Sequence, residues 1–121
     1  MSYNAVVLVS QDFPKSFDDI LDSFQDLKVV KCSDMNAFIQ INDFNFNFNF
    51  NNDDSVVLET LEILKKGGYV NDGFVPGRSR IEISGDDDPN MDYFNDFLMI
   101  LSSLSKQSGL LVYELAAQEF V

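Results

Sequence analysis

The feature that most constrains the fold is an alternation of apolar and other residues whose phase reverses once between residues 37 and 50. Apolar side chains occupy the odd positions from 37 to 41, and phenylalanines occupy the even positions from 44 to 50. A period of two is the spacing of one face of a β-strand. A two-residue turn at Asn42-Asp43 explains the reversal, because Asn and Asp tolerate the left-handed backbone of such turns.

The turn fixes which residues of the two strands lie opposite each other. It pairs Ile41 with Phe44, and the register then continues outward to place six apolar side chains on one face: Ala37, Ile39, Ile41, Phe44, Phe46 and Phe48. The other face carries Gln40, Asn45 and Asn47. A β-bulge in one long strand also reverses the phase, but we favour the hairpin. The Phe-Asn tract is then a core strand and not a low-complexity segment.

The segments before this hairpin predict two strands and a helix. Residues 5–9 are continuously apolar and β-branched, as in a strand buried on both faces. A helix begins at Ser16, a good N-cap, and its apolar stripe runs to Leu27. Residues 28–32 form the second predicted strand, which ends at Cys32.

The segments after the hairpin predict two more helices and two more strands. Residues 56–66 form a helix whose inner stripe is Val57, Leu61 and Leu64, with Gly67 at the C′ position. Residues 68–77 form a loop and residues 78–84 a strand. Asp88-Pro89 begins the last helix, which runs to about residue 106. Residues 110–115 form the final strand.

This order of elements predicts an α+β fold with about three helices packed on one largely antiparallel sheet. The composition does not change along the chain, so residues 1–121 are expected to form a single domain. A chain of this length buries a sufficient core without metals or disulfides. The pattern leaves the order of the strands open.

The residue types argue against catalysis. The chain has no histidine, which is the commonest general base and metal ligand. Its single cysteine, Cys32, is interpreted as a buried structural residue with no base to activate it. One cysteine also excludes an internal disulfide, as suits a reducing cytoplasm. No signal peptide or membrane-spanning stretch is recognised, so we predict a cytoplasmic protein.

Metal and cofactor sites are not expected either. Gly67-Gly68 lacks the strand, loop and helix context of a phosphate-binding loop. The consecutive aspartates at residues 86–88 lack the alternating ligands and closing glutamate of a calcium loop. They are interpreted as a helix cap and an acidic patch. A carboxylate turned inward at Glu82, Glu114 or Glu119 remains an alternative that leaves enzymatic function open.

Charge is the strongest functional signal. Twenty acidic residues stand against eight basic ones, which gives a net charge of −12. A field of this sign repels nucleic acid and anionic membranes and attracts cationic partners. The acidic residues form two clusters, at residues 18–26 and 86–96. In the predicted last helix Asp88, Asp92 and Asp96 share one face, although like charges at this spacing destabilise a helix.

A small α+β domain with these acidic clusters and no catalytic set resembles the immunity proteins of bacterial contact-dependent growth inhibition systems. The resemblance implies that the protein binds the toxin domain delivered by a neighbouring cell. A basic nuclease toxin, bound as a one-to-one heterodimer with its active-site region covered, is the partner this implies. An acidic nucleic-acid mimic or a small adaptor protein remains the alternative.

The expected contact residues are the two acidic clusters with two aromatic side chains from the glycine-rich loop. They are Asp18, Asp19, Asp22, Asp26, Asp86, Asp87, Asp88, Asp92, Asp96, Tyr69 and Phe74. Less central candidates are Asp53, Asp54, Asp72 and Glu119. Reversal of Asp87, Asp88 and Asp92 to Lys is expected to slow association and leave the fold intact.

Overall fold

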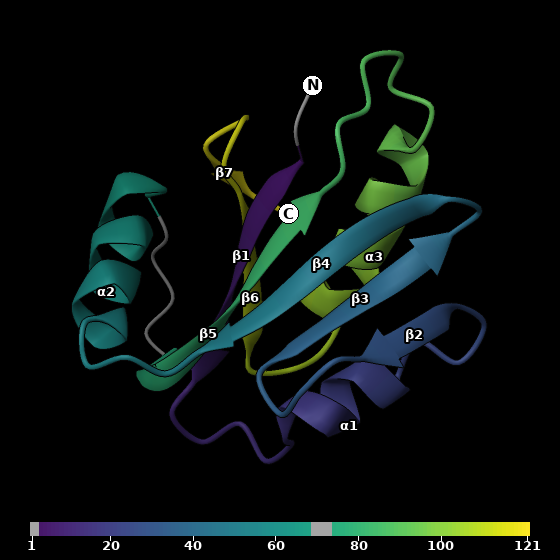
Figure 1. Cartoon of the computed structure of the whole chain (residues 1–121). Coiled ribbons are helices and arrows are strands. Elements are labelled where there is room, and N and C mark those ends of the chain that lie inside the picture. Colours follow the sequence, from purple (N-terminus) through teal and green to yellow (C-terminus); the bar gives the residue numbers. More distant parts are fainter. Residues whose placement is uncertain (1–2, 69–73) are drawn as a thin grey trace.

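An antiparallel sheet with strand order β2-β3-β4-β5-β1-β6-β7 forms the frame of the protein (Figure 1). The computed structural model describes residues 3–68 and 74–121. Within them the strands are β1 (Asn4–Ser10), β2 (Lys28–Lys31), β3 (Asn36–Ile41), β4 (Phe44–Asn51), β5 (Pro76–Gly85), β6 (Leu110–Glu114) and β7 (Glu119–Phe120). The helices are α1 (Phe17–Asp22), α2 (Val56–Lys66) and α3 (Phe94–Ser105). The predicted α+β class is confirmed.

The predicted hairpin is confirmed in its register. β3 pairs with β4 so that Ile41 lies opposite Phe44, and the pairing continues outward to Ala37 and Phe48. Asn42 has a φ of 54°, the left-handed conformation that the turn requires. The hairpin places β4 between β3 and β5, so that a neighbouring strand pairs with each of its edges.

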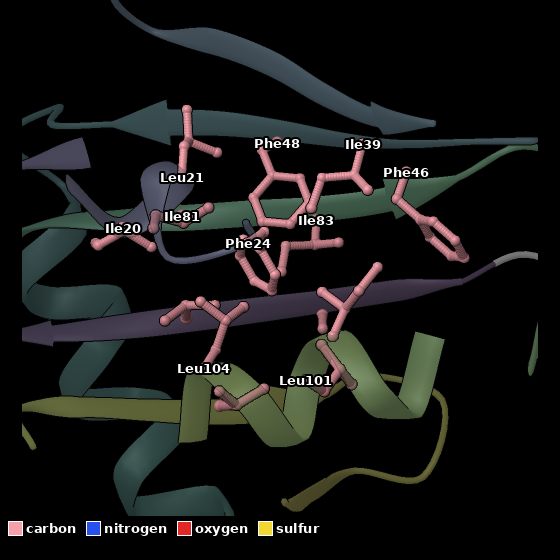
Figure 2. Close-up of a cluster of buried hydrophobic side chains, with 14 of the residues drawn as sticks. Ile20, Leu21, Phe24, Ile39, Phe46, Phe48, Ile81, Ile83, Leu101 and Leu104 are labelled. Atoms are coloured by element: carbon pink, nitrogen blue, oxygen red, sulfur yellow. The ribbon is translucent and has the colours of Figure 1, made fainter. Parts of the chain in front are cut away.

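The phenylalanine face of the sheet carries the main core. Side chains from β3, β4 and β5 interleave there with those from α1 and α3 (Figure 2). Phe46 and Phe48 are fully buried in this layer, as are Leu101 and Leu104 of α3. Both helices therefore pack on the same face, and each closes the core with its own apolar stripe.

The opposite face of the sheet is only partly covered. α2 lies there, separate from the other two helices (Figure 1), and its Ile63 and Leu64 pack against Val6 and Leu8 of β1. The β3–β4 hairpin shows its asparagine side to this face, and Asn49 is exposed. The predicted strand at residues 5–9 is confirmed as buried on both faces, because helices cover β1 on each side.

The first helix is shorter than predicted. Ser16 is its N-cap: the Ser16 hydroxyl accepts from the backbone N–H of Asp19, and the Asp19 carboxylate accepts from that of Ser16. The helix ends at Asp22 because the next turn tightens to i→i−3 hydrogen bonds, and the Ser23 hydroxyl donates to the Ile20 carbonyl. Phe24 and Leu27 reach the core from the following turn.

The bounds predicted for the second helix are confirmed, and Leu64 of its predicted inner stripe packs on the core, but the place of Leu61 in that stripe is wrong. Val56 and Thr60 are buried, whereas Leu61 is exposed. Since α2 covers only the β1 side of the sheet, the side chains toward the hairpin remain in solvent. Gly67 has right-handed geometry, and Gly68 takes the left-handed conformation with a φ of 67°.

Two smaller predictions are also corrected. Cys32 is exposed, since β2 ends at Lys31 and the chain turns away from the sheet. The strand predicted at residues 78–84 begins earlier, at Pro76. No helix in the described part of the chain is both long and apolar enough to cross a membrane.

Candidate protein-binding surface

Asp88 is an internal support of the loop between β5 and α3. Only 4% of its surface is exposed. Its carboxylate accepts hydrogen bonds from the Tyr3 hydroxyl at 2.5 Å, from the backbone N–H of Tyr93 at 2.9 Å and from that of Asp92 at 3.1 Å. The prediction that it caps a helix starting at Pro89 is wrong, because α3 starts at Phe94 and an irregular turn precedes it.

Tyr3 and Asp88 form a buried pair, and each shifts the pKa of the other. Burial raises the pKa of Asp88, but the hydrogen bonds from Tyr3, Tyr93 and Asp92 outweigh it and hold the pKa below its ordinary value. Burial first, and then the hydrogen bond to Asp88, raises the pKa of Tyr3 well above its ordinary value. The pair is therefore a neutral phenol donating to a carboxylate at neutral pH.

We expect this pair to stabilise the fold less as the pH falls. A lowered folded-state pKa means that the unfolded chain takes up the proton first, near pH 3.9. The contribution of Asp88 is thus present above that pH and is lost as the pH drops through its folded pKa. Tyr3→Phe should cost about 1–3 kcal/mol in urea unfolding at pH 7. The loss should shrink at pH 3, and an equal loss at both pH values would contradict the assignment.

The same loop gathers carboxylates at one end of the sheet. The backbone N–H of Asn45 donates to the Asp86 carboxylate at 2.9 Å, and that of Asp86 donates to the Asn45 carbonyl at 3.1 Å. These bonds hold the loop beside the β3–β4 turn. We call the resulting cluster the acidic end, and it comprises Asp43, Asp86, Asp87, Asp92 and Asp96. The segments that build it, residues 32–64 and 81–105, contain no Lys or Arg.

Apolar side chains are exposed on the same loop and helix as these carboxylates. Met91 is 46% exposed and has a φ of 59°, a strained conformation for a residue other than glycine. Leu98 and Met99 on the outer side of α3 are also exposed. Apolar side chains surrounded by charged ones are typical of the centre and rim of a protein-binding surface.

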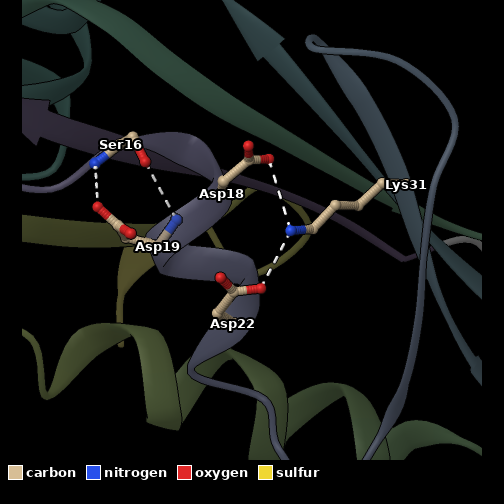
Figure 3. A network of polar contacts seen from close by, with 5 residues as sticks. All are labelled: Ser16, Asp18, Asp19, Asp22 and Lys31. Atoms are coloured by element: carbon tan, nitrogen blue, oxygen red, sulfur yellow. Dashed lines mark hydrogen bonds and ion pairs between the residues drawn. The ribbon is translucent and has the colours of Figure 1, made fainter.

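The acidic cluster of the first helix is partly neutralised and lies elsewhere. Lys31 Nζ lies 3.0 Å from an Asp22 carboxylate oxygen and 3.7 Å from one of Asp18, while Asp19 caps the helix (Figure 3). Hydrogen bonds from Ser16 hold the pKa of Asp19 below its ordinary value, and the hydrogen bond to Asp22 raises the pKa of Lys31. Asp26 follows in the exposed turn.

The structure does not join the two predicted acidic clusters into one patch. α1 meets the C-terminal end of α3, where Gln107 donates to the Ser23 hydroxyl. The acidic end lies at the N-terminal end of α3, and a 12-residue helix spans roughly 18 Å. Asp88, Asp92 and Asp96 do not share a helix face as predicted, because only Asp96 belongs to the helix.

The other predicted contact residues are scattered. Tyr69 and Asp72 lie outside the described residues. Phe74 is half-buried and packs against the cluster of Val6, Leu8 and Tyr113, so it is not an exposed anchor. The less central candidates Asp53 and Asp54, which are adjacent, and Glu119, near the other end of the chain, are exposed. Sequence reasoning missed Met91 and Met99 as surface residues; the late start of α3 leaves Met91 in the loop, and Met99 lies on the outer side of the helix.

Two of the three carboxylates considered for chemistry, Glu82 and Glu114, have structural partners, and Glu119 is exposed. Glu82 binds Arg80, whose guanidinium also binds Glu59 across to α2. Glu114 accepts from the backbone N–H groups of the turn that follows β6. Within residues 3–68 and 74–121, no group of His, Cys, Asp and Glu is arranged to hold a metal ion.

Comparisons with known proteins identify no relative: no family model, curated protein or solved structure matches the chain.

Proposed function

We propose that the protein binds a basic protein partner through the acidic end and that it acts by this binding and not by catalysis. The observation that carries the proposal is the acidic end itself. It gathers five carboxylates on segments with no basic residue, and exposed Met91 and Met99 belong to the loop and helix that carry all of them except Asp43. Carboxylates of this kind speed encounter with a cationic surface, and exposed apolar side chains on the same segments slow dissociation.

Within this class we propose an immunity protein that neutralises a toxin. A nuclease toxin has a basic cleft for nucleic acid, and the acidic end offers carboxylates in place of phosphates. Arg and Lys of the cleft then form charge-assisted hydrogen bonds with Asp92 and Asp96. The resulting complex is one-to-one and blocks access of the substrate. Association is fast because the net charge of −12 attracts the toxin.

The test is co-expression with the product of the adjacent gene, followed by kinetics with the purified complex. The variant Asp43→Lys, Asp92→Lys and Asp96→Lys should slow association about tenfold or more at low salt. It leaves out Asp88, which the fold needs. The matched control is Asp53→Lys, Asp54→Lys and Glu62→Lys, which changes the net charge equally at exposed positions around and on α2.

The possible outcomes distinguish a specific interface at the acidic end from a general effect of net charge and from a nucleic-acid mimic. A one-to-one complex with lost toxin activity, weakened only by the first triple variant, supports the proposal. Equal slowing by both triple variants would assign the effect to net charge and remove the acidic end from the interface. Capture of unrelated DNA-binding proteins with no cognate partner would instead support a nucleic-acid mimic.

A further inference from the structure

A large open cavity lies at the other end of the central strands. β1, β4 and β5 begin or end at the acidic end with Asn4, Phe44 and Gly85. At their opposite termini, with Ser10, Phe50 and Pro76, they line an open groove of about 950 Å³. The pairing of β1 with β5 slips between Leu8 and Ser10, so the sheet opens where the groove begins. This groove is separate from the surface proposed for a protein partner.

The groove is mainly apolar and its walls come from elements far apart in the sequence. Phe13 lines it from the segment between β1 and α1, Phe17 from the first residue of α1, and Phe50 from the end of β4. Leu61 of α2 and Val75 before β5 complete it, and they are 48% and 51% exposed. The exposure of such residues costs free energy in water, and their clustering around one cavity is typical of a ligand site.

Two cationic side chains line the groove as well. Within residues 3–68 and 74–121, neither Arg78 nor Lys15 forms an ion pair, whereas Lys31 and Arg80 do. Two carboxylates also line the groove: Asp18, which is 3.7 Å from Lys31 Nζ, and Asp34 in the turn before β3. The chain has a net charge of −12, so most of its surface repels anions. Exposed Arg78 provides a positive charge beside the apolar cavity.

We propose that this groove binds a small apolar anion. The Arg78 guanidinium holds its carboxylate or sulfonate by charge-assisted hydrogen bonds, with Lys15 as a second cation. The apolar body of the ligand covers Phe50, Leu61 and Val75. The size is suitable, because sites for small molecules range from about 300 to 1,000 Å³. The protein thus has a small-molecule site that is independent of the partner-binding surface.

The experiment uses two anionic probes on the folded chain: 8-anilinonaphthalene-1-sulfonate, followed by its fluorescence, and decanoate as a competitor. We expect saturable binding at pH 7 with one site and displacement by decanoate. Arg78→Glu and, separately, Leu61→Asp should each weaken binding about tenfold or more. Lys65→Glu is the matched control, since it makes the same charge change on the exposed side of α2 and should leave the affinity unchanged.

Three results would overturn the proposal. They are the absence of saturable binding to the native chain, the same affinity in Arg78→Glu as in the native chain, and displacement by decanol as strong as by decanoate. The last would show that the anionic group contributes nothing. Circular dichroism verifies that each variant is folded, and Arg78→Ala serves in place of Arg78→Glu if the reversed charge unfolds the chain. Partner binding is not measured, so the result is independent of the proposed function.

Discussion

Phe46→Ala should cost about 3–5 kcal/mol of the free energy of unfolding, which is a large part of the total stability of a domain this size. Phe46 is fully buried. Its ring lies 6.0 Å from the rings of both Tyr3 and Phe97 and 4.9 Å from that of Phe44. The substitution therefore removes apolar burial, leaves a cavity and loosens the support of the Tyr3-Asp88 pair. Urea unfolding at pH 7 measures the loss.

The neighbouring residue provides the control for this prediction. Asn47 follows Phe46 in β4 but faces the side of the sheet that the main core does not cover. Asn47→Ala should change the free energy of unfolding by less than about 1 kcal/mol. Similar losses for the two variants would contradict the two-faced sheet and the alternation on which the fold assignment rests.

Asp88→Lys is expected to lower the midpoint of thermal unfolding by about 10 °C or more. The groups around the Asp88 carboxylate, namely the Tyr3 hydroxyl and the N–H groups of Asp92 and Tyr93, all donate to it. An ammonium group accepts no hydrogen bond, so the substitution leaves these donors unsatisfied. It also buries a positive charge against the partial positive charges of their N–H and O–H groups. Far-UV circular dichroism follows the unfolding.

The comparison for Asp88→Lys is Asp92→Lys in the same loop. Asp92 is exposed, and it supports Asp88 through its backbone N–H, which the substitution retains. Its midpoint should shift by only a few degrees. If the two variants unfold at the same temperature, Asp88 does not support the loop, and the earlier expectation that it is an exposed contact residue is restored.

The register of the hairpin could be predicted because it is determined by residues that are close together in the sequence. A strict period of two and one phase change at Asn42-Asp43 permit few arrangements, and burial of one face selects the register. The α+β class followed from the order of such local signals. The strand order could not be predicted, since β1 pairs with β5 and β6, which are distant in the sequence.

The candidate site was predicted less well, because its geometry depends on tertiary contacts. Asp88-Pro89 has the sequence of a helix start, yet the Asp88 carboxylate accepts from the hydroxyl of Tyr3, just before β1, and the helix starts only at Phe94. One buried contact thereby removed Asp88 from the predicted surface and brought Met91 onto it. The sequence likewise gave no sign that Lys31 neutralises Asp18 and Asp22, which requires β2 to lie beside α1.

The central position of β4 links stability to resistance against aggregation. A tract of alternating Phe and Asn without a charge is suited to stack on copies of itself, and strands of that kind pair readily when their edges are free. In the folded protein β3 and β5 occupy both edges of β4, and the outer strand β2 is short and has a lysine at each end. Any variant that unfolds the sheet, Phe46→Ala among them, therefore exposes this tract and lowers the concentration at which the chain stays dissolved.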